Sequence, residues 1–239
     1  MRVGRILIRA YFDLVYNPVY DFTTAQFASY HRLQSKCVDK FEFDDGDRVL
    51  CVGVGTGNEI IRILGINSKV NIVGVDYSKI ALQKAYKKAL RLGKEIEILT
   101  MDARRLEFGT GSFNKVLCLH VMDFVGENEQ VTGEILRVLK DGGQFVITYP
   151  SGKEGAKLGV NLLKDSIRHN IDSRNRFRAF STLVAQMVVG TVYLPLFLRP
   201  KKRFYSRREL EAIFSEFTDG ELQIEEYPMY QDFIVYGKK

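Results

Sequence analysis

The sequence predicts an α/β fold: a seven-stranded, mostly parallel sheet with helices on both faces and an antiparallel hairpin at its C-terminal end. The first observation is that short apolar strand patterns alternate with helical patterns between residues 48 and 149. Parallel neighbours need crossover connections, and the intervening helices supply them. The second observation is that two strand patterns, 221–230 and 231–239, follow each other almost without a gap. They therefore predict an antiparallel hairpin at the sheet edge.

The elements follow in order from their own patterns. A helix is expected over residues 24–40, after an N-terminal segment, and another over 206–217 leads into the hairpin. Ser78 is a suitable N-cap for the helical pattern that it opens, and Gly93 is a suitable stop at its end. The other strand patterns are 48–54, 70–76, 96–101, 115–120 and 143–149, and the helical patterns between them are 58–65, 78–93 and 128–143, with a weaker segment after residue 102.

Composition fits one large domain or one domain with an insertion. The chain has 239 residues, 46% hydrophobic content, a net charge of +6 and a pI near 9.1. This charge suits an anionic partner such as a membrane surface or nucleic acid, but it does not predict a fold. Cys37, Cys51 and Cys118 form no close pair, and two of them lie in apolar strand patterns, so we expect a reducing, cytoplasmic compartment. Arginines interrupt the apolar start at residues 1–12, which makes a poor signal peptide and still suits a membrane surface.

A glycine-rich turn follows the first strand in the stretch "VLCVGVGTGNE". Gly53, Gly55 and Gly57 alternate there, where a strand becomes a helix, and glycine permits positive φ and close approach of a ligand. A turn of this kind places a nucleotide against backbone amides at a helix N-terminus. Dinucleotide folds use G-x-G-x-x-G, and here the third glycine comes one residue early, so NAD is the lesser candidate.

Two aspartates end the next two strand patterns. Asp76 in "NIVGVDYS" lies about twenty residues beyond the glycines, where a carboxylate can accept hydrogen bonds from ribose hydroxyls. Asp102 in "ILTMDARRL" ends the third strand and can reach an adenine amino group. Either aspartate alone is compatible with a helix N-cap or a solvated turn. The presence of both aspartates, in register with the glycines, favours a nucleoside site.

Together these motifs resemble the class I S-adenosylmethionine-dependent methyltransferases, whose sheet is Rossmann-like. The resemblance runs from Arg48 to Lys239 through "VLCVGVGTG", "VGVDYS", "TMDARRLEFGTGSFNKVLCLHVM", "EILRVLKDGGQFVITYP" and the closing hairpin. It implies S-adenosylmethionine as cofactor and S-adenosylhomocysteine as product. It also implies a site in which the glycines border the methionine part, Asp76 holds the ribose, Tyr77 covers one adenine face, and Asp102 with the Ala103 backbone amide reads the adenine edge.

Cys51 departs from this pattern, because the family often carries an acidic residue at its position, two before the first glycine. The acid usually helps to order the glycine loop and the cofactor's amino group, and a cysteine supplies no such charge. The resemblance therefore implies weaker cofactor binding here. A non-catalytic cofactor-binding module remains an alternative.

His120 is the best-placed titratable group for catalysis. It lies in "VLCLHVMDF", at the carboxyl end of the fourth strand, where the acceptor meets the cofactor, and its unperturbed pKa suits a general base. The alternative is a histidine that packs or hydrogen-bonds beside the cofactor. Methyl transfer from a sulfonium needs mainly orientation and a dry pocket, so no single residue is indispensable.

The N-terminal stretch "AYFDLVYNPVYDF" is rich in aromatic residues. It resembles the "YDLVF…FD" entry segment of bacterial phosphatidylethanolamine N-methyltransferases, and more loosely the quinone C-methyltransferases, in which this region closes over the cofactor. Phe12 stands where that pattern usually has a tyrosine, so Tyr16, with Tyr20, is the candidate for its role. Ordinary core packing is the alternative. We expect residues 1–40 to form a cap segment and helix.

Residues 151–203 stand where this family commonly inserts a substrate cover. The basic stretches "RNRFRAF" and "RPKKRF" flank "STLVAQMVVGTVYLPLFL", which carries no charge and is short for a membrane-spanning helix. An apolar surface that dips into an anionic membrane interface fits this pattern, and packing as core or dimer contact is the alternative. Nucleic acid is not expected, because the positive charge adjoins aliphatic residues rather than an aromatic-studded groove.

The sequence thus predicts a single methyltransferase domain over residues 1–239. The expected acceptor is hydrophobic or lipid-like, such as a phospholipid amine or an isoprenoid quinone, met by a cytoplasmic protein at the inner face of the membrane. A methyltransferase for a soluble small molecule is the alternative. No metal is expected, and the oligomeric state stays open.

Overall fold

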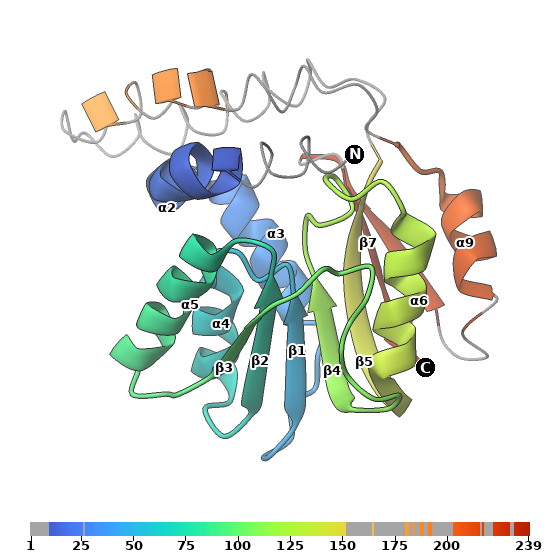
Figure 1. The fold of residues 1–239 in the computed structure, drawn as a ribbon. Coiled ribbons are helices and arrows are strands. Elements are labelled where there is room, and N and C mark those ends of the chain that lie inside the picture. The colour runs from blue at the N-terminus through green and yellow to red at the C-terminus, as the bar shows by residue number, and fades with distance from the viewer. Residues whose placement is uncertain are drawn as a thin grey trace.

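The computed structural model describes residues 10–25, 27–151, 164, 180–181, 184, 187–188, 191–192, 203–215, 217, 222–229 and 232–239. Within these residues the strands form one seven-stranded sheet in the order β3-β2-β1-β4-β5-β7-β6 (Figure 1). The strands are β1 (Arg48–Val52), β2 (Asn71–Asp76), β3 (Glu97–Thr100), β4 (Phe113–Cys118), β5 (Leu139–Pro150), β6 (Leu222–Tyr227) and β7 (Asp232–Lys238).

Strand pairing confirms the predicted architecture. β1 to β5 pair in parallel, whereas β7 runs antiparallel between β5 and β6. The chain reverses direction in sheet order at β1, since β2 and β3 lie on one side of it and β4 on the other. A crevice forms outside the carboxyl ends of strands at such a switch point.

Helices cover both faces of the sheet, as the sequence predicts (Figure 1). On one face α3 (Ala28–Val38), α4 (Asn58–Ile66) and α5 (Lys79–Arg91) pack residues such as Leu33, Ile63 and Ala85 onto the sheet. On the other face α6 (Asn128–Val138) and α9 (Arg207–Ser215) bury residues such as Ile135 and Phe214. Both faces of the central strands are therefore apolar, which explains their nearly continuous hydrophobic runs.

The N-terminal region differs from the prediction of one helix over 24–40. Two further helical segments, η1 (Phe12–Tyr16) and α2 (Asn17–Thr24), precede α3. The backbone of Phe27 is extended (φ −108°, ψ 96°), so the helical path is interrupted before Ala28. In Figure 1, α2 lies beyond the carboxyl ends of β1 and β2.

Several predicted boundaries were also wrong by a few residues. The first strand ends at Val52 rather than Val54, because Gly53 already has a left-handed backbone (φ 66°). The helix predicted over 128–143 ends at Val138, and β5 begins at once with Leu139. Gly142 has φ 74°, which a helix does not accommodate, so the tertiary structure gives this segment to the sheet.

Two local predictions were confirmed. The Ser78 hydroxyl accepts a hydrogen bond from the Ala81 backbone amide at 3.1 Å, as an N-cap does. Gly93 follows α5 with φ 72°, the left-handed conformation that commonly ends a helix. Cys37, Cys51 and Cys118 are free thiols, and all three are buried.

Candidate active site

A cavity of about 480 Å³ opens at the carboxyl ends of the parallel strands. Its walls come from η1, α2, the glycine turn, the ends of β2 and β3, and the segment after β4. The predicted site residues that line it are Tyr16, Gly53, Gly55, Asp76, Tyr77, Asp102, Ala103 and His120. Gly57 lines a second, smaller hollow of about 40 Å³ that shares Tyr20, Gly53, Gly55 and His120 with the larger cavity.

The glycine turn has a conformation that other residues adopt only at a cost. Gly57 has φ 77°, and a Cβ atom there would lie 2.8 Å from Ala85 Cβ of α5. Gly53 has φ 66°, and its Cβ would lie 2.1 Å from Val121 Cγ2. The turn therefore lets α4 begin close to α5 and lets the segment after β4 approach β1.

Asp76 ties the glycine turn to the end of β2. Its Oδ2 accepts a hydrogen bond from the Gly55 backbone amide and its Oδ1 one from the Ser78 amide, each at 2.8 Å. Burial raises the pKa of this carboxyl, while the backbone amides lower it. A carboxylate has about four acceptor positions, so Asp76 keeps capacity for a ribose hydroxyl.

Asp102 lies at the end of β3 and is bound by Arg104. Oδ1 accepts from the Arg104 backbone amide (3.0 Å) and Nε (2.9 Å), and Oδ2 accepts from Nη2 (2.5 Å). An adenine amino group would thus share this carboxylate with a guanidinium, a partner that the sequence did not predict. Tyr77 is 42% exposed and lines the same cavity as Ala103, a position from which its ring can cover a planar base.

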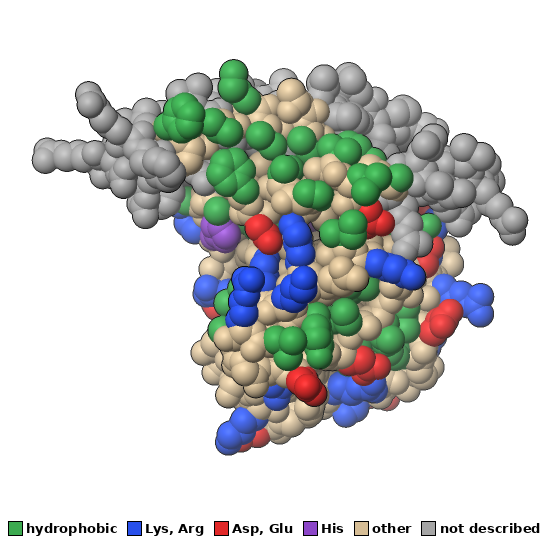
Figure 2. All heavy atoms as spheres, turned by 60° about the vertical axis from the view of Figure 1, so that its left-hand side comes forward, with side chains coloured by type: hydrophobic (Ala, Val, Ile, Leu, Met, Phe, Trp, Pro, Cys, Tyr) green, Lys and Arg blue, Asp and Glu red, His purple; other side chains and the backbone are tan. Residues whose placement is uncertain are grey.

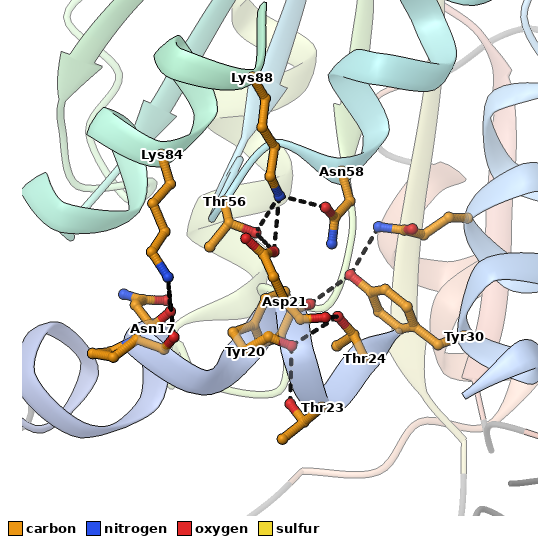
Figure 3. Close-up of polar contacts among 12 residues, drawn as sticks. Asn17, Tyr20, Asp21, Thr23, Thr24, Tyr30, Thr56, Asn58, Lys84 and Lys88 are labelled. Carbon is orange, nitrogen blue, oxygen red and sulfur yellow. Dashed lines mark hydrogen bonds and ion pairs between the residues drawn. The ribbon is translucent and has the colours of Figure 1, made fainter. Parts of the chain in front are cut away.

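The α2 helix is fastened to the glycine turn by a group of polar contacts (Figure 3). Asp21 Oδ1 accepts hydrogen bonds from Thr56 Oγ1 (2.5 Å) and Lys88 Nζ (2.8 Å). The same Lys88 ammonium also donates to Thr56 Oγ1 (3.2 Å) and Asn58 Oδ1 (2.6 Å), and nearby Lys84 Nζ donates to the Asn17 carbonyl (2.6 Å). Residues from α2, the turn, α4 and α5 therefore form one connected group.

His120 has a conformation unusual for its residue type, with φ 56°. Its Nδ1 lies 3.4 Å from Asp232 Oδ2 and 3.8 Å from Asp123 Oδ2, and its ring stacks on Tyr30 at 5.8 Å between centroids. The imidazole therefore lies beside two carboxylates and against an aromatic face. A His held in this way can accept a proton within the cavity.

Aromatic residues from η1, α2 and the segment after β4 line the cavity. The Phe12 ring contacts Tyr16 and Phe124 edge-on, with centroids 5.1 and 5.4 Å away. Tyr20 and Tyr30 share a hydrogen bond of 2.5 Å between their hydroxyls, and Gln34 Nε2 donates to Tyr30 at 2.8 Å. The predicted entry segment therefore both packs its aromatic rings together and lines the cavity.

Comparison with known protein families identifies the family of this chain. Residues 43–213 match the model of the family described as "Methyltransferase domain". The chain belongs to this family. This description agrees with the sequence resemblance to methyltransferases.

Three similar proteins illustrate the relationship of this methyltransferase domain to others. A phosphatidylethanolamine N-methyltransferase of Cereibacter sphaeroides is 38% identical over 104 residues, which are 43% of this chain and 50% of the relative. A demethylmenaquinone methyltransferase of Thermus thermophilus is 31% identical over 110 residues, 46% of this chain and 50% of the relative. The chain thus spans about half the length of these curated relatives.

The fold also matches solved methyltransferase structures. An S-adenosylmethionine-dependent methyltransferase from Aquifex aeolicus superposes with a TM-score of 0.57 at 16% identity, covering 91% of this chain and 96% of that one. This likeness supports the Rossmann-like fold that the sequence predicted.

The cavity of the methyltransferase domain fits the cofactor in size and chemistry. Cofactor pockets commonly measure 300 to 1,000 Å³, and the glycine turn, Asp76, Tyr77 and Asp102 all line this cavity. None of the helices in the described ranges combines the length and apolar character that a membrane crossing requires.

Besides Arg104, sequence reasoning missed four polar residues in or beside the site. Asp21 and Asp232 lie far from the glycine turn in sequence, and the order of residues gives no sign that they approach it. Asp123, three residues after His120, follows it closely enough to have been considered. Glu59 stands directly after "GTGN", and it is one of the residues that line the smaller hollow.

Proposed function

We propose that this protein transfers a methyl group from S-adenosylmethionine to a hydrophobic or lipid-like acceptor that it meets at a membrane surface. One observation carries the proposal: the cavity lined by the predicted cofactor residues is also lined by Phe12, Tyr16, Phe124 and Val125. Aromatic and aliphatic walls favour an apolar acceptor. The names of the two curated relatives, which specify a phospholipid and a quinone precursor, support the same class.

The surface around the cavity supports approach from a membrane. Leu14, Val15 and Phe22 of the N-terminal helices are 72%, 42% and 41% exposed. Figure 2, which brings the α2 and α5 side forward, shows hydrophobic side chains above a group of Lys and Arg side chains. An exposed apolar surface beside cations suits insertion among anionic headgroups.

The proposed substrate cover over residues 151–203 falls mostly outside the described residues, as does the start of the N-terminal segment, residues 1–9. Its described pieces include Val192, whose carbonyl accepts a hydrogen bond from the Tyr11 hydroxyl beside η1. In Figure 1 the described pieces between 180 and 192 lie beyond α2. This contact supports a cover that joins the N-terminal cap over the acceptor end of the cavity.

In the proposed reaction the bound cofactor supplies an activated methyl group, whose bond to sulfur breaks as the acceptor's lone pair attacks and the sulfur keeps the bonding electrons. His120 takes the proton that the acceptor loses, and Asp232 holds the imidazole by its Nδ1 side. Tyr16, which lines the same cavity as the glycine turn, orients the acceptor. The aromatic walls exclude water from the reacting atoms.

Flotation with liposomes tests the membrane part of the proposal. The protein is expected to float with anionic vesicles at low salt, less with zwitterionic vesicles, and less again at high salt because salt screens the headgroup attraction. The paired substitution Leu14→Asp and Phe22→Asp should abolish flotation and leave binding of S-adenosylhomocysteine unchanged. A protein that stays unbound on anionic vesicles at low salt would instead favour a soluble small-molecule acceptor.

Turnover assays test the acceptor and the roles of the side chains. With phosphatidylethanolamine or a demethylated quinone in mixed micelles, methylated product should form, and His120→Gln should lower kcat by about 10²- to 10⁴-fold, the usual contribution of a general base. The affinity for S-adenosylhomocysteine should change little in this variant. Tight cofactor binding without turnover on any acceptor would favour a non-catalytic module.

A further inference from the structure

The smaller hollow beside the glycine turn contains one buried acid. Its described lining residues are Tyr20, Tyr30, Gln34, Gly53, Val54, Gly55, Thr56, Gly57, Asn58, Glu59, Leu119 and His120. Glu59 is the only carboxylic acid among them, and it is 8% exposed. The hollow, of about 40 Å³, has room for a small polar group, since one water needs roughly 10 to 15 Å³.

Glu59 is not neutralised by the protein's own cations. Lys88 is the basic side chain that acts on it most strongly, but the three donors of the Lys88 ammonium go to Asp21, Thr56 and Asn58. Among the described residues, the only group that hydrogen-bonds the Glu59 carboxyl is its own backbone amide. A buried carboxylate without a cationic partner is costly, and such a group usually has a function.

The hollow adjoins the larger cavity at the glycine turn, because both are lined by Gly53, Gly55 and His120, whereas Tyr77 and Ala103 line the larger cavity alone. A nucleoside held by Asp76 and Asp102 therefore directs its sulfur substituents toward His120 and the glycines. The amino-acid end of the cofactor carries an ammonium group, and a buried carboxylate is the chemical complement of that group.

We propose that Glu59 binds the ammonium group of the cofactor's methionine end and so supplies the negative charge of the cofactor site on the glycine-turn side. This inference rests on the proposed use of S-adenosylmethionine. Cys51 is unsuited to the task, because its side chain is 1% exposed and packs with the apolar residues of α3 and α4. Burial and the nearby Glu59 charge raise the pKa of the Cys51 thiol, which keeps it uncharged.

Titration of Glu59 gives the inference a measurable signature. Burial raises the pKa of its carboxyl to about 7 in the ligand-free protein, and Lys88 and His120 oppose this rise only in part. The charged or titratable groups around it are Cys51 of β1, Asp76 of β2, Lys88 of α5, His120 after β4, Tyr20 of α2 and Tyr30 of α3. A bound ammonium stabilises the carboxylate, so cofactor binding below pH 7 should release roughly one proton.

Calorimetric titration with S-adenosylhomocysteine at pH 5.5 and 7.0, in buffers of different ionisation enthalpy, tests this. The wild-type protein should bind roughly tenfold more tightly at pH 7.0 and release a proton at pH 5.5. Glu59→Gln should lose most of that proton release and bind S-adenosylhomocysteine about 10- to 100-fold more weakly at pH 7.0. The matched control is Glu129→Gln, which changes an exposed acid at the same position of α6 and should alter neither quantity.

A second probe separates ammonium binding from a structural role. The nucleoside 5′-methylthioadenosine has the adenosine and sulfur but no amino-acid end, so Glu59→Gln should bind it as tightly as the wild type does. Equal weakening for both ligands would show that Glu59 only maintains the turn and would overturn the inference. Unchanged S-adenosylhomocysteine binding in Glu59→Gln would overturn it as well, whereas a wild-type protein that binds neither ligand would contradict the proposed function itself.

Discussion

Helices α4 and α6 begin with the same two residues, Asn-Glu, and the two pairs have opposite environments. In α4, Asn58 lies near the surface and accepts a hydrogen bond from Lys88, while Glu59 is 8% exposed. In α6, Asn128 is 1% exposed and Glu129 is bound to Arg203 at the surface. The dipeptide alone therefore does not decide which of its side chains is buried.

The difference follows from what precedes and surrounds each helix. Gly57 leads into α4 with a left-handed backbone (φ 77°, ψ 34°), and its missing side chain lets Ala85 of α5 come close. Glu127 leads into α6 with φ −107° and ψ 63°, a conformation open to any residue. A tightly covered first turn buries Glu59 beside the cofactor cavity, whereas an open one leaves Glu129 in water.

The largest expected effect comes from giving a side chain to Gly57, whose missing Cβ lets α5 come close to the start of α4. Gly57→Ala places a Cβ atom 2.8 Å from Ala85 in a left-handed backbone, so it should lower the free energy of unfolding by about 2 to 5 kcal/mol. The matched change in α6 is Gly133→Ala, where the nearest atom is Phe217 Cζ at 3.7 Å. It should stabilise the protein by about 0.5 to 1 kcal/mol. Urea unfolding measures both, and equal effects would contradict the role of the turn.

The next effect concerns the buried acid in the ligand-free protein. The pKa of Glu59 in the folded protein, about 7, lies above its ordinary value of 4.5. Between these two pH values the folded state therefore binds more protons than the unfolded state. The free energy of unfolding consequently falls as the pH rises from 4.5 to 7. Glu59→Gln should remove this loss and be about 2 to 3 kcal/mol more stable than the wild type at pH 8, with little difference at pH 4. Urea unfolding at both pH values checks this. If the difference between the two proteins were the same at both, Glu59 would not titrate in this window.

Replacing Asn128 should destabilise the protein more than replacing Asn58, because Asn128 is the more deeply buried of the two asparagines. Asn128 donates to the Met122 carbonyl at 3.1 Å within the protein, and Asn128→Ala should cost about 1 to 3 kcal/mol because it leaves that buried carbonyl without its donor. Asn58→Ala removes only one of three acceptors around Lys88 and should cost less than about 1 kcal/mol. Thermal or urea unfolding of the two variants gives the order directly.

The smallest effect is expected for the surface ion pair between Glu129 and Arg203. Glu129 and Arg203 lie 2.5 Å apart, and their side chains are 47% and 50% exposed, so solvent screens the pair. Glu129→Gln should change the free energy of unfolding by less than about 0.5 kcal/mol, and by still less at 0.5 M salt. A loss comparable with that of Asn128→Ala would show that this pair holds more of the structure than its exposure indicates.

Local sequence was sufficient for the order of the strands and for the glycine turn with its acid. Alternating patterns gave the order of strands and helices, and glycines at 53, 55 and 57 with Asp76 gave the turn and its acid, since each is a property of neighbouring residues. The end of the helix predicted over 128–143 was wrong because the helical pattern continues into residues whose hydrogen bonds the sheet takes up. Arg104 was missed as the partner of Asp102, although it lies only two residues away.

The sequence by itself determined the fold class, the carboxyl-edge turn and the cofactor family, because periodicity and backbone preference act over a few residues. Tertiary structure alone decided that Asp21 would reach Thr56, that Asp232 would lie 3.4 Å from His120, and that Glu59 would be buried beside the smaller hollow. These contacts depend on how distant helices and strands pack together. The burial of a charged group and its distances to other groups set its energy, and both are fixed only when that packing has formed.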